Sequence, residues 1–442
     1  MLRIWYLRDA MKKACIIGAG PSGITAAKNL IQVGITDFVV YEKSDKIGGN
    51  WVYSEDGDHS SVFETTHIIS SKKLSQYEDY PMPDDFPDYP SHQQLYNYFN
   101  GYAEHFELHK YIQFNTAIEK AELNAEGNWE IRLSDGSVEQ FDNLLVCNGH
   151  HSVPRMPQYP GEFSGEYIHS HDYKNNRKFI GKKVLVIGGG NSACDIAVET
   201  CRVSDITYIS MRRGYYFVPK FLLGKPVDQM NDGVGFVPKP IRNLIFKLLL
   251  KISVGDYSNY GLQKPDHDLL NSHPVVNSEL LYFINHGKIK AKVEIDKFSG
   301  DTVHFKDGSA VDVDVIIAAT GYKITFPFFD TSFIDFADGY VPLYKKVFHS
   351  KIKNLFFIGL VQPTGCIWPL SDAHAQLAAN HIIGNYQLPS DIDSRIEKEI
   401  EVIKNNYMDT PRHSVEVDFH DHLAELKKEI PMNAPKWETV TA

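Results

Sequence analysis

Cys15-Ile16-Ile17-Gly18-Ala19-Gly20-Pro21-Ser22-Gly23 is the stretch that decides the fold. A short apolar run enters a G-x-G-x-x-G turn and a helical pattern leaves it, as in the βαβ unit that binds dinucleotides. Gly18 permits the tight turn, Gly20 lets the backbone approach a pyrophosphate, and Gly23 lets helix and strand pack closely. The N-terminus of the helix then offers N–H groups to phosphates.

An acidic residue stands at the expected distance from this turn. The apolar run Phe38–Tyr41 predicts the second strand, and it ends at Glu42, nineteen residues after Gly23. A carboxylate at that place accepts a hydrogen bond from a ribose 2′-hydroxyl. A bare glycine motif can be an ordinary turn, but strand, helix and acid together favour a dinucleotide site.

The pattern of strand, glycine turn and helix occurs a second time. Lys183–Ile187 predicts a strand, and the turn Gly188–Ala193 opens another helix. After the next predicted strand, Ile206–Ser210, the residue nineteen positions beyond the turn is Arg212, followed by Arg213. An arginine there pairs with a 2′-phosphate, which favours NADP over NAD. The alternative is a pair of surface arginines after a strand.

Composition limits the class of protein. The 442 residues are 43% hydrophobic, enough for two domains, and the net charge of −11 argues against nucleic-acid binding. The five cysteines include no C-x-x-C pair, which fits a reducing, cytoplasmic environment. No apolar run approaches the roughly 20 residues that span a bilayer. Met1–Ala10 is too short for a signal peptide, and we expect it to contribute little to the fold.

Two later segments mirror each other. Val313–Ala319 with Thr320-Gly321-Tyr322 repeats the pattern of Leu144–Gly149, as expected if each nucleotide domain closes with a similar strand and turn. The chain then returns to the first domain. We therefore predict an α/β protein with two Rossmann-like domains, the NADP domain inserted into the FAD domain, with ranges 1–160 and 326–442 for FAD and 161–325 for NADP.

One amphipathic segment has two interpretations. Ile241–Ile252 carries Arg242, Lys247 and Lys251 among apolar residues. Docking on its own domain is favoured, and a role at a membrane surface is the alternative.

Several motifs together resemble the flavin-containing monooxygenases. Phe163-x-Gly165-x-x-x-His169-x-x-x-Tyr173 matches the family's identifying sequence, and Ala319–Tyr322 matches its A-T-G-Y segment. Arg212–Gly214 matches the arginines that bind the NADP phosphate, and Gly48–Trp51 resembles G-G-L-W with asparagine for leucine. Related Baeyer–Villiger enzymes carry W-P where this chain has Tyr173-Lys174, which favours a heteroatom oxidiser. The family's membrane-bound C-terminal segment has no counterpart in this sequence, so the resemblance implies a soluble, bacterial-type member.

The resemblance implies an NADPH- and O₂-dependent monooxygenase of the N,N-dimethylaniline type. NADPH reduces FAD, O₂ adds at the flavin C4a position, and an amine or sulfide takes the distal oxygen. It implies no metal site and allows a homodimer. The predicted FAD residues are Gly18, Gly20, Pro21, Ser22, Gly23, Glu42, Gly49, Asn50 and Trp51. The predicted NADP residues are Gly188, Gly190, Asn191, Ser192, Ala193, Asp195, Arg212 and Arg213, with Thr320 and Gly321 as further cofactor contacts.

Three alternatives compete with this function. A pyridine-nucleotide disulfide oxidoreductase needs a redox cysteine pair that the sequence lacks. A Baeyer–Villiger ketone oxidiser shares both nucleotide motifs. An NADPH oxidase or sensing flavoprotein would bind both cofactors without oxygenating a substrate.

One departure from the family pattern concerns the flavin edge. Counting from Phe63, Ile69 stands where the family has an asparagine that supports the oxygenated flavin. Thr66, His67, Ser70 and Ser71 are the nearby polar candidates. A shift of one or two residues in the strand would bring His67 or Thr66 to the flavin edge, where a hydroxyl or imidazole can accept from the flavin N5–H. We predict that one of them has this catalytic role, and that His169 braces the structure without taking part in catalysis.

Overall fold

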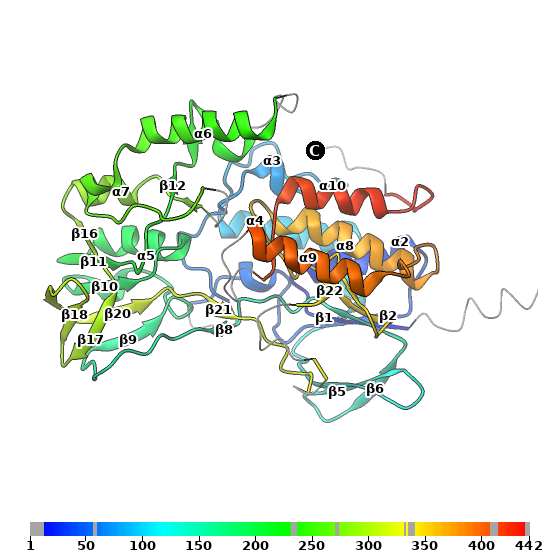
Figure 1. Ribbon diagram of the computed structural model, residues 1–442. Coiled ribbons are helices and arrows are strands. Elements are labelled where there is room, and N and C mark those ends of the chain that lie inside the picture. The colour runs from blue at the N-terminus through cyan, green and yellow to red at the C-terminus, as the bar shows by residue number, and fades with distance from the viewer. Residues whose placement is uncertain are drawn as a thin grey trace, which may run out of the picture. The chain divides into compact units, whose positions relative to one another are not determined.

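The computed structural model describes residues 13–55, 60–230, 237–269, 274–330, 333–334, 341–406 and 414–437. They form two compact units (Figure 1). The first contains the residues up to Val52, Lys72–His150 and those from Ile324 onward, and the second contains Tyr53–Ser71 and His151–Lys323. The second unit is thus inserted into the first. Met1–Ala10 lies outside the described residues.

A mainly parallel sheet forms the centre of the first unit. Its strands, in order across the sheet, are β22 (Leu343–Tyr344), β23 (Phe348–His349), β24 (Leu355–Phe357), β7 (Asn143–Val146), β1 (Ala14–Ile17), β2 (Phe38–Tyr41) and β3 (Ile112–Gln113). From β24 to β3 all neighbours run parallel. The chain moves to one side of β1 for β2 and to the other for β7, so the strand order reverses at β1. Ligands bind outside the carboxyl ends of strands at such a point.

Helices and a small sheet cover the two faces of this central sheet (Figure 1). The helices of the first unit are α2 (Pro21–Gln32), α3 (Lys72–Ser75), α4 (His92–His105), α8 (Ile367–Ile382), α9 (Ile392–Asn406) and α10 (Phe419–Glu429). The small sheet is β4 (Ile118–Leu123), β5 (Trp129–Leu133) and β6 (Val138–Phe141). Trp129 and Phe141 of this sheet pack with Cys15 and Leu144 of the central strands.

The second unit repeats the plan. Its parallel sheet has the order β16 (Ile289–Lys292), β11 (Ile206–Ser210), β10 (Lys183–Ile187), β20 (Val315–Ala318) and β9 (Glu166–His169). One face packs on α5 (Asn191–Cys201) and α7 (Leu280–Asn285). The other packs on β17 (Ile295–Ser299), β18 (Thr302–Phe305) and β19 (Ala310–Asp312). Helix α6 (Lys239–Val254) lies beyond α5 and α7, away from the strands (Figure 1).

The mirrored strands are confirmed. β7 lies beside the first glycine strand, β1, and β20 lies beside the second, β10. Tyr53–Ser71, within the range 1–160 predicted for the FAD domain, packs instead with the second unit, where Phe63 meets Tyr173 edge to face. The chain crosses between the units after Val52, Ser71, His150 and Lys323.

The remaining elements are short. In the first unit they are η1 (Gly49–Trp51), η2 (Leu108–Tyr111), β25 (Gln362–Pro363) and β26 (Glu416–Val417). In the second they are β8 (Val153–Pro154), η3 (Arg177–Phe179), β12 (Phe217–Val218), β13 (Phe221–Leu222), β14 (Lys225–Pro226), η4 (Val227–Gln229), η5 (Tyr257–Tyr260), β15 (Val275–Val276) and β21 (Tyr322–Lys323). Within the described ranges no helix has the length and apolarity to cross a membrane, and no cluster of side chains could hold a metal ion.

Candidate cofactor sites

Two glycines of the first turn are required by the protein itself. Gly18 has φ +96°, which L-residues rarely adopt, and its N–H donates to the Tyr41 carbonyl at 2.8 Å. A Cβ on Gly23 would lie 1.8 Å from the Gly18 carbonyl oxygen, because α2 and β1 approach closely there. These two positions therefore need glycine whether or not a cofactor binds.

Gly20 is different, because nothing in the protein requires glycine there. Its φ of −70° suits any residue, and the nearest atom to a Cβ would be the Gly49 Cα, at 3.6 Å. No side chain caps the helix that begins at Pro21, and its first turn carries no acidic residue. The N-terminus of the helix is uncapped, and Gly20 beside it has no side chain. This arrangement suits the binding of a pyrophosphate.

Glu42 is held in a fixed orientation. The Ala19 N–H donates to its Oε2 at 2.7 Å, and the Ser44 N–H and hydroxyl both donate to Oε1 at 2.9 Å. Each carboxylate oxygen has two lone pairs, so one acceptor site, on Oε2, remains for a ribose hydroxyl. The predicted acid is thus tied directly to the glycine turn.

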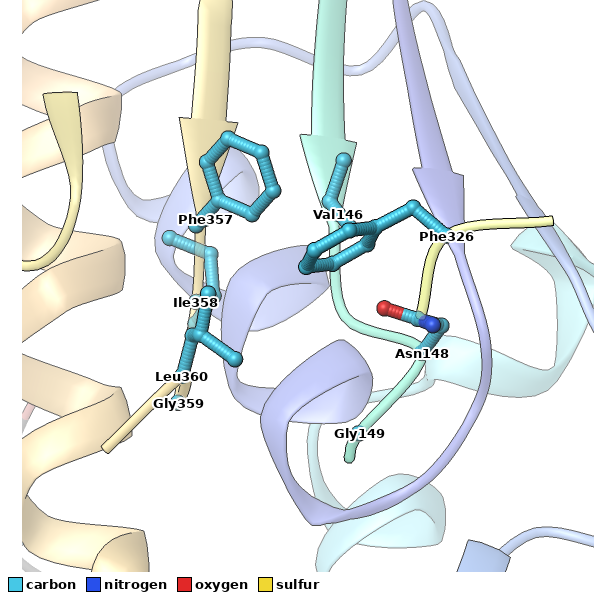
Figure 2. A pocket seen from close by; sticks show the side chains of 8 residues that line it. All are labelled: Val146, Asn148, Gly149, Phe326, Phe357, Ile358, Gly359 and Leu360. Atoms are coloured by element: carbon cyan, nitrogen blue, oxygen red, sulfur yellow. The ribbon is translucent and has the colours of Figure 1, made fainter. Parts of the chain in front are cut away.

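A pocket opens at the carboxyl edge of the central sheet (Figure 2). It is small and partly open to solvent, and it is lined by Val146, Asn148, Gly149, Phe326, Phe357, Ile358, Gly359 and Leu360. Gly359 follows β24 with φ +77°, and a Cβ there would lie 2.2 Å from the Ser22 Oγ. Asn148, Gly149 and Gly359 thus join the candidate site, and the sequence signal for them was a glycine soon after a buried strand.

Gly49, Asn50 and Trp51 form the short helix η1. Gly49 has φ +52°, and a Cβ there would meet the Gly20 Cα at 3.1 Å. The Trp51 ring stands edge-on to Trp368 of α8, with centroids 5.5 Å apart. The G-G-N-W segment is therefore brought against the first glycine turn.

A buried ionic network, which the sequence analysis missed, anchors the glycine helix. The Lys28 ammonium lies 2.6 Å from Asp79 and 2.8 Å from Asp372 of α8. Thr25 and Asn29 also donate to Asp372, at 2.6 and 2.8 Å. Burial alone would lower the pKa of Lys28, but the two carboxylates outweigh it and raise that pKa. The network fixes α2 against α8.

The second glycine turn is equally crowded. Gly188 has φ +134°, and a Cβ there would lie 2.4 Å from the Ala319 carbonyl oxygen. A Cβ on Gly189 would meet the Tyr215 ring. The helix α5 begins after Gly190 with no side-chain cap, so its N-terminus is open to a phosphate, as in the first unit.

Four predicted NADP residues lie on the first turns of α5, and partners of two of them are seen within the protein. Asn191 accepts from the Val276 N–H at 2.8 Å, and Asp195 accepts from the Asn277 amide at 2.6 Å. Asn277 in turn accepts from the first N–H groups of α7. Ser192 is exposed, and Ala193 is buried. Asn191 and Asp195 thus attach β15 and α7 to the nucleotide helix.

The charge of Asp195 is expected to oppose folding. Burial raises the pKa of Asp195 to about 6, against the smaller lowering effects of Lys220 and Asn277. The folded protein therefore keeps this proton between about pH 4 and pH 6 while the unfolded chain loses it, so this group's contribution to stability falls as pH rises through that range. We expect Asp195→Asn to melt at pH 7 at the parent's temperature or above it, with a gain in the free energy of unfolding of at most about 3 kcal/mol.

The measurement is thermal unfolding of both proteins from pH 4 to pH 8. The difference between variant and parent should grow up to about pH 6 and then stay constant, because only Asp195 differs in its titration. A variant that is less stable than the parent at pH 7 would show that pairing with Lys220 outweighs burial.

The two arginines after β11 have different surroundings. Arg212 is exposed and has no carboxylate partner among the described residues. The Arg213 guanidinium lies over the Tyr215 ring at 5.3 Å, and its charge helps to lower the pKa of Asp266. Arg212 is therefore the side chain more available for a 2′-phosphate.

His169 and the A-T-G-Y segment lie together. The His171 N–H donates to His169 Nδ1 at 3.1 Å, so Nε2 carries the proton and donates to the Gly321 carbonyl at 3.1 Å. Burial lowers the pKa of His169, which keeps the ring neutral. Thr320 donates to the Arg155 carbonyl at 2.5 Å. His169 thus braces the turn that leads out of the second unit.

Known proteins resemble this chain over nearly its whole length. The sequence model of a family described as flavin-binding monooxygenase-like matches residues 11–437. The chain belongs to this family. Flavin-containing monooxygenase 5 of Rattus norvegicus is 34% identical over 441 residues, 94% of this chain and 82% of that protein. Dimethylaniline monooxygenase (N-oxide-forming) 2 of Oryctolagus cuniculus is 33% identical over 449 residues, 95% of this chain and 82% of that protein.

Solved structures share the fold of this flavin-binding monooxygenase. The S-allyl-L-cysteine S-oxygenase of Allium sativum superposes with a TM-score of 0.71 at 22% identity, over 95% of this chain and 89% of that one. NADP⁺-bound cyclohexanone monooxygenase of Rhodococcus sp. Phi1 gives 0.71 at 17% identity, over 94% and 96%. At these identities the likeness concerns the fold, and it confirms the α/β class with two Rossmann-like domains.

Family membership and the two turns agree on the cofactors. This flavin-binding monooxygenase uses FAD, NADPH and O₂. The open N-termini of α2 and α5, the small Gly20 and the exposed Arg212 fit FAD in the first unit and NADP in the second. The assignment of individual residues to each cofactor stays a prediction.

Thr66 and His67 belong to the second unit of this monooxygenase, whereas the first glycine turn belongs to the first unit. The Thr66 hydroxyl accepts from the Phe63 N–H at 2.9 Å and keeps its own proton to donate. The His67 ring is exposed, and its Nδ1 lies 2.8 Å from the Thr65 carbonyl oxygen. Their role at the flavin stays a prediction.

Proposed function

We propose that this monooxygenase oxygenates soft nucleophiles, namely the nitrogen of amines and the sulfur of sulfides. The observation that carries the proposal is the 33% identity, over 95% of the chain, to an N-oxide-forming dimethylaniline monooxygenase. One turnover would consume NADPH, a proton, O₂ and substrate, and release NADP⁺, water and the oxygenated substrate. Bound FAD supplies the hydride acceptance and oxygen activation that side chains cannot.

The chain's own residues bind and orient the cofactors. In this proposal, Gly18–Gly23 and the α2 N-terminus hold the FAD pyrophosphate, while Glu42 accepts from the adenosine ribose. The open start of α5 holds the NADP pyrophosphate, and Arg212 pairs with the 2′-phosphate. The Lys28 network and the edge contact between Trp51 and Trp368 keep the FAD cradle rigid, because preorganised sites depend on such supporting contacts.

Residues Tyr173 and Lys174 of the identifying sequence favour heteroatom oxidation over ketone oxidation. Where Baeyer–Villiger enzymes carry W-P, Tyr173 is buried and stacks on Phe179, with centroids 5.6 Å apart. The buried Lys174 ammonium donates to the Ser60 carbonyl at 2.5 Å. A Trp-Pro pair could not reproduce this ammonium contact.

Product analysis under ¹⁸O₂ tests the proposal. With NADPH and N,N-dimethylaniline or a methyl aryl sulfide, we expect one labelled oxygen in the N-oxide or sulfoxide, and little lactone or ester from cyclic ketones. Preferential ketone oxidation would support the Baeyer–Villiger alternative. NADPH consumption with equivalent H₂O₂ and no product would support the oxidase or sensing alternative.

We propose further that the protein is located in the cytoplasm and forms a homodimer. The location is supported by the cysteines, all of which are free and buried, as in a reducing compartment. The homodimer rests on the family resemblance, and sedimentation equilibrium tests it.

Thr66→Ala and His67→Ala are expected to uncouple the reaction. If either side chain supports the flavin, its loss should leave the rate of flavin reduction by NADPH unchanged. The amount of H₂O₂ released per NADPH should rise several-fold, because the activated oxygen would be lost as H₂O₂ before it is transferred to the substrate. The measurement is H₂O₂ and product per NADPH in each variant. Thr65→Ala, on the same exposed turn, is the matched control. Unchanged coupling in both variants would contradict this role.

A further inference from the structure

Two buried histidines lie behind the turn that follows β24. His374 is on α8 and His422 is on α10. The His374 Nδ1 lies 3.3 Å from the Gly359 nitrogen, and the His374 Nε2 lies 3.4 Å from the His422 Nε2. Because Gly359 lines the pocket at the carboxyl edge of the central sheet, the histidine pair lies one contact away from the FAD site (Figure 2).

One arrangement of protons on neutral rings satisfies both contacts. The Gly359 N–H is a donor, so the Nδ1 of His374 accepts and carries no proton. A neutral His374 ring then has its proton on Nε2 and donates it to the Nε2 of His422, whose own proton is on Nδ1. His422 thereby fixes the tautomer of His374 that the contact with Gly359 requires.

The surroundings keep both rings neutral. Burial, His422 and Lys346 all lower the pKa of His374 well below its ordinary value. Burial, Lys346 and Lys345 lower the pKa of His422 to about 3. At neutral pH the lone pair on the His374 Nδ1 is therefore available to the Gly359 N–H.

The turn at Gly359 is packed closely against both helices of the FAD cradle. Gly359 has φ +77°, and a Cβ there would meet the hydroxyls of Ser22 on α2 and Ser371 on α8. These two hydroxyl oxygens lie 3.0 Å apart and link the helices. Ser371 and His374 are three positions apart, so both lie on the side of α8 that faces this turn.

We propose that His374 is a positioning residue for FAD. It accepts from the Gly359 N–H and so keeps the turn after β24 against Ser22, at the predicted pyrophosphate site, while His422 acts through His374 by fixing its tautomer. Without this acceptor, the FAD-bound conformation would contain a buried, unpaired N–H, whereas the turn in the FAD-free protein could move until that N–H reached water. Loss of the contact should therefore lower the affinity for FAD.

Two substitutions of His374 separate its two contacts. In His374→Asn the Oδ1 takes the place of Nδ1 and can accept from Gly359, but the shorter side chain does not reach His422. In His374→Gln the amide takes the place of Nε2 and reaches His422, and no acceptor faces Gly359. We expect the dissociation constant for FAD to stay within about twofold of the parent's in His374→Asn and to rise about 10-fold in His374→Gln. The fluorescence of flavin released on dilution of the loaded protein measures it.

His422→Leu gives an independent test. It removes the acceptor of the Nε2 proton and so allows the other tautomer of His374, in which an N–H at Nδ1 opposes the Gly359 N–H. The dissociation constant should rise about 10-fold in the parent background and change little when His374→Asn is already present. His381→Leu is the control: it removes a contact with the Tyr386 carbonyl farther along α8 and should leave the affinity for FAD unchanged.

Two results would overturn the proposal. One is an affinity for FAD in His374→Gln equal to the parent's, and the other is an equal loss in His374→Asn and His374→Gln, because neither would depend on an acceptor at Nδ1. If far-ultraviolet circular dichroism shows His374→Gln to be unfolded, His422→Leu decides, and an equal loss with and without His374→Asn would overturn it. These measurements involve no amine or sulfide, so they are independent of the substrate class.

The proposal rests on the assignment of FAD to the first unit. A Gly20→Val protein that stays loaded with flavin would contradict that assignment, and the histidine variants would not be needed to show it.

Discussion

Gly20→Val is expected to give a colourless protein. The backbone at Gly20 has an ordinary φ, and a Cβ would have 3.6 Å to the Gly49 Cα, so glycine is not required there by backbone strain. The valine methyl groups would occupy the space that the pyrophosphate needs at the start of α2. We expect flavin absorbance per protein to fall to the background level and activity to be lost with it.

Two other glycines of the same βαβ unit serve as controls. Gly34→Ala is strained by a φ of +85° but meets no atom within 4 Å, so it should lose some stability and stay yellow. Gly23→Ala should fail to fold, because its Cβ would lie against the Gly18 carbonyl oxygen. A fully flavin-loaded Gly20→Val protein would contradict the assignment of FAD to the first turn.

Arg212→Ala is expected to remove the preference for NADPH. A charge-assisted contact with the 2′-phosphate is worth roughly 1.5–3 kcal/mol. The KM for NADPH should therefore rise about 10- to 100-fold, while the KM for NADH changes little because NADH lacks that phosphate. The steady-state rate of coenzyme oxidation, measured as a function of NADPH or NADH concentration, gives both KM values.

Arg213→Ala is the matched comparison. Arg213 lies over Tyr215 and near Asp266, so its loss should affect stability and both coenzymes alike. If Arg212→Ala instead weakened NADPH and NADH equally, Arg212 would have a structural role and Arg213 would be the candidate for the phosphate.

Local patterns were predictable from the sequence. The two glycine turns, their strands and Glu42 follow rules of spacing, and the structure shows Glu42 accepting from the Ala19 N–H of the first turn. The mirrored strands β7 and β20 were also found, because each is a buried apolar run before a glycine turn.

Features that depend on distant segments were not predictable. From the sequence, Lys28 would be expected to be a solvent-exposed residue of a helix. Its burial depends on the ion pairs with Asp79 and Asp372, which are distant in the chain. The packing of Phe63 in the second unit depends on Tyr173, more than a hundred residues later in the chain. Asn191 and Asp195 stand at cofactor positions of the motif, yet the structure shows them holding Val276 and Asn277, which no spacing rule encodes.

The Lys28–Asp372 contact has a consequence for biosynthesis. The two residues are 344 positions apart, so at about 5–20 residues per second the helix α2 leaves the ribosome roughly 20–70 s before its buried partner is made. The sequence of the inserted unit is complete at Lys323, before either β24 or α8 has been synthesised. The nucleotide unit in the middle of the chain can therefore close first. The FAD cradle, although its glycine turn is encoded first, is complete only after α8 has been made, so we expect flavin loading to follow the synthesis of α8.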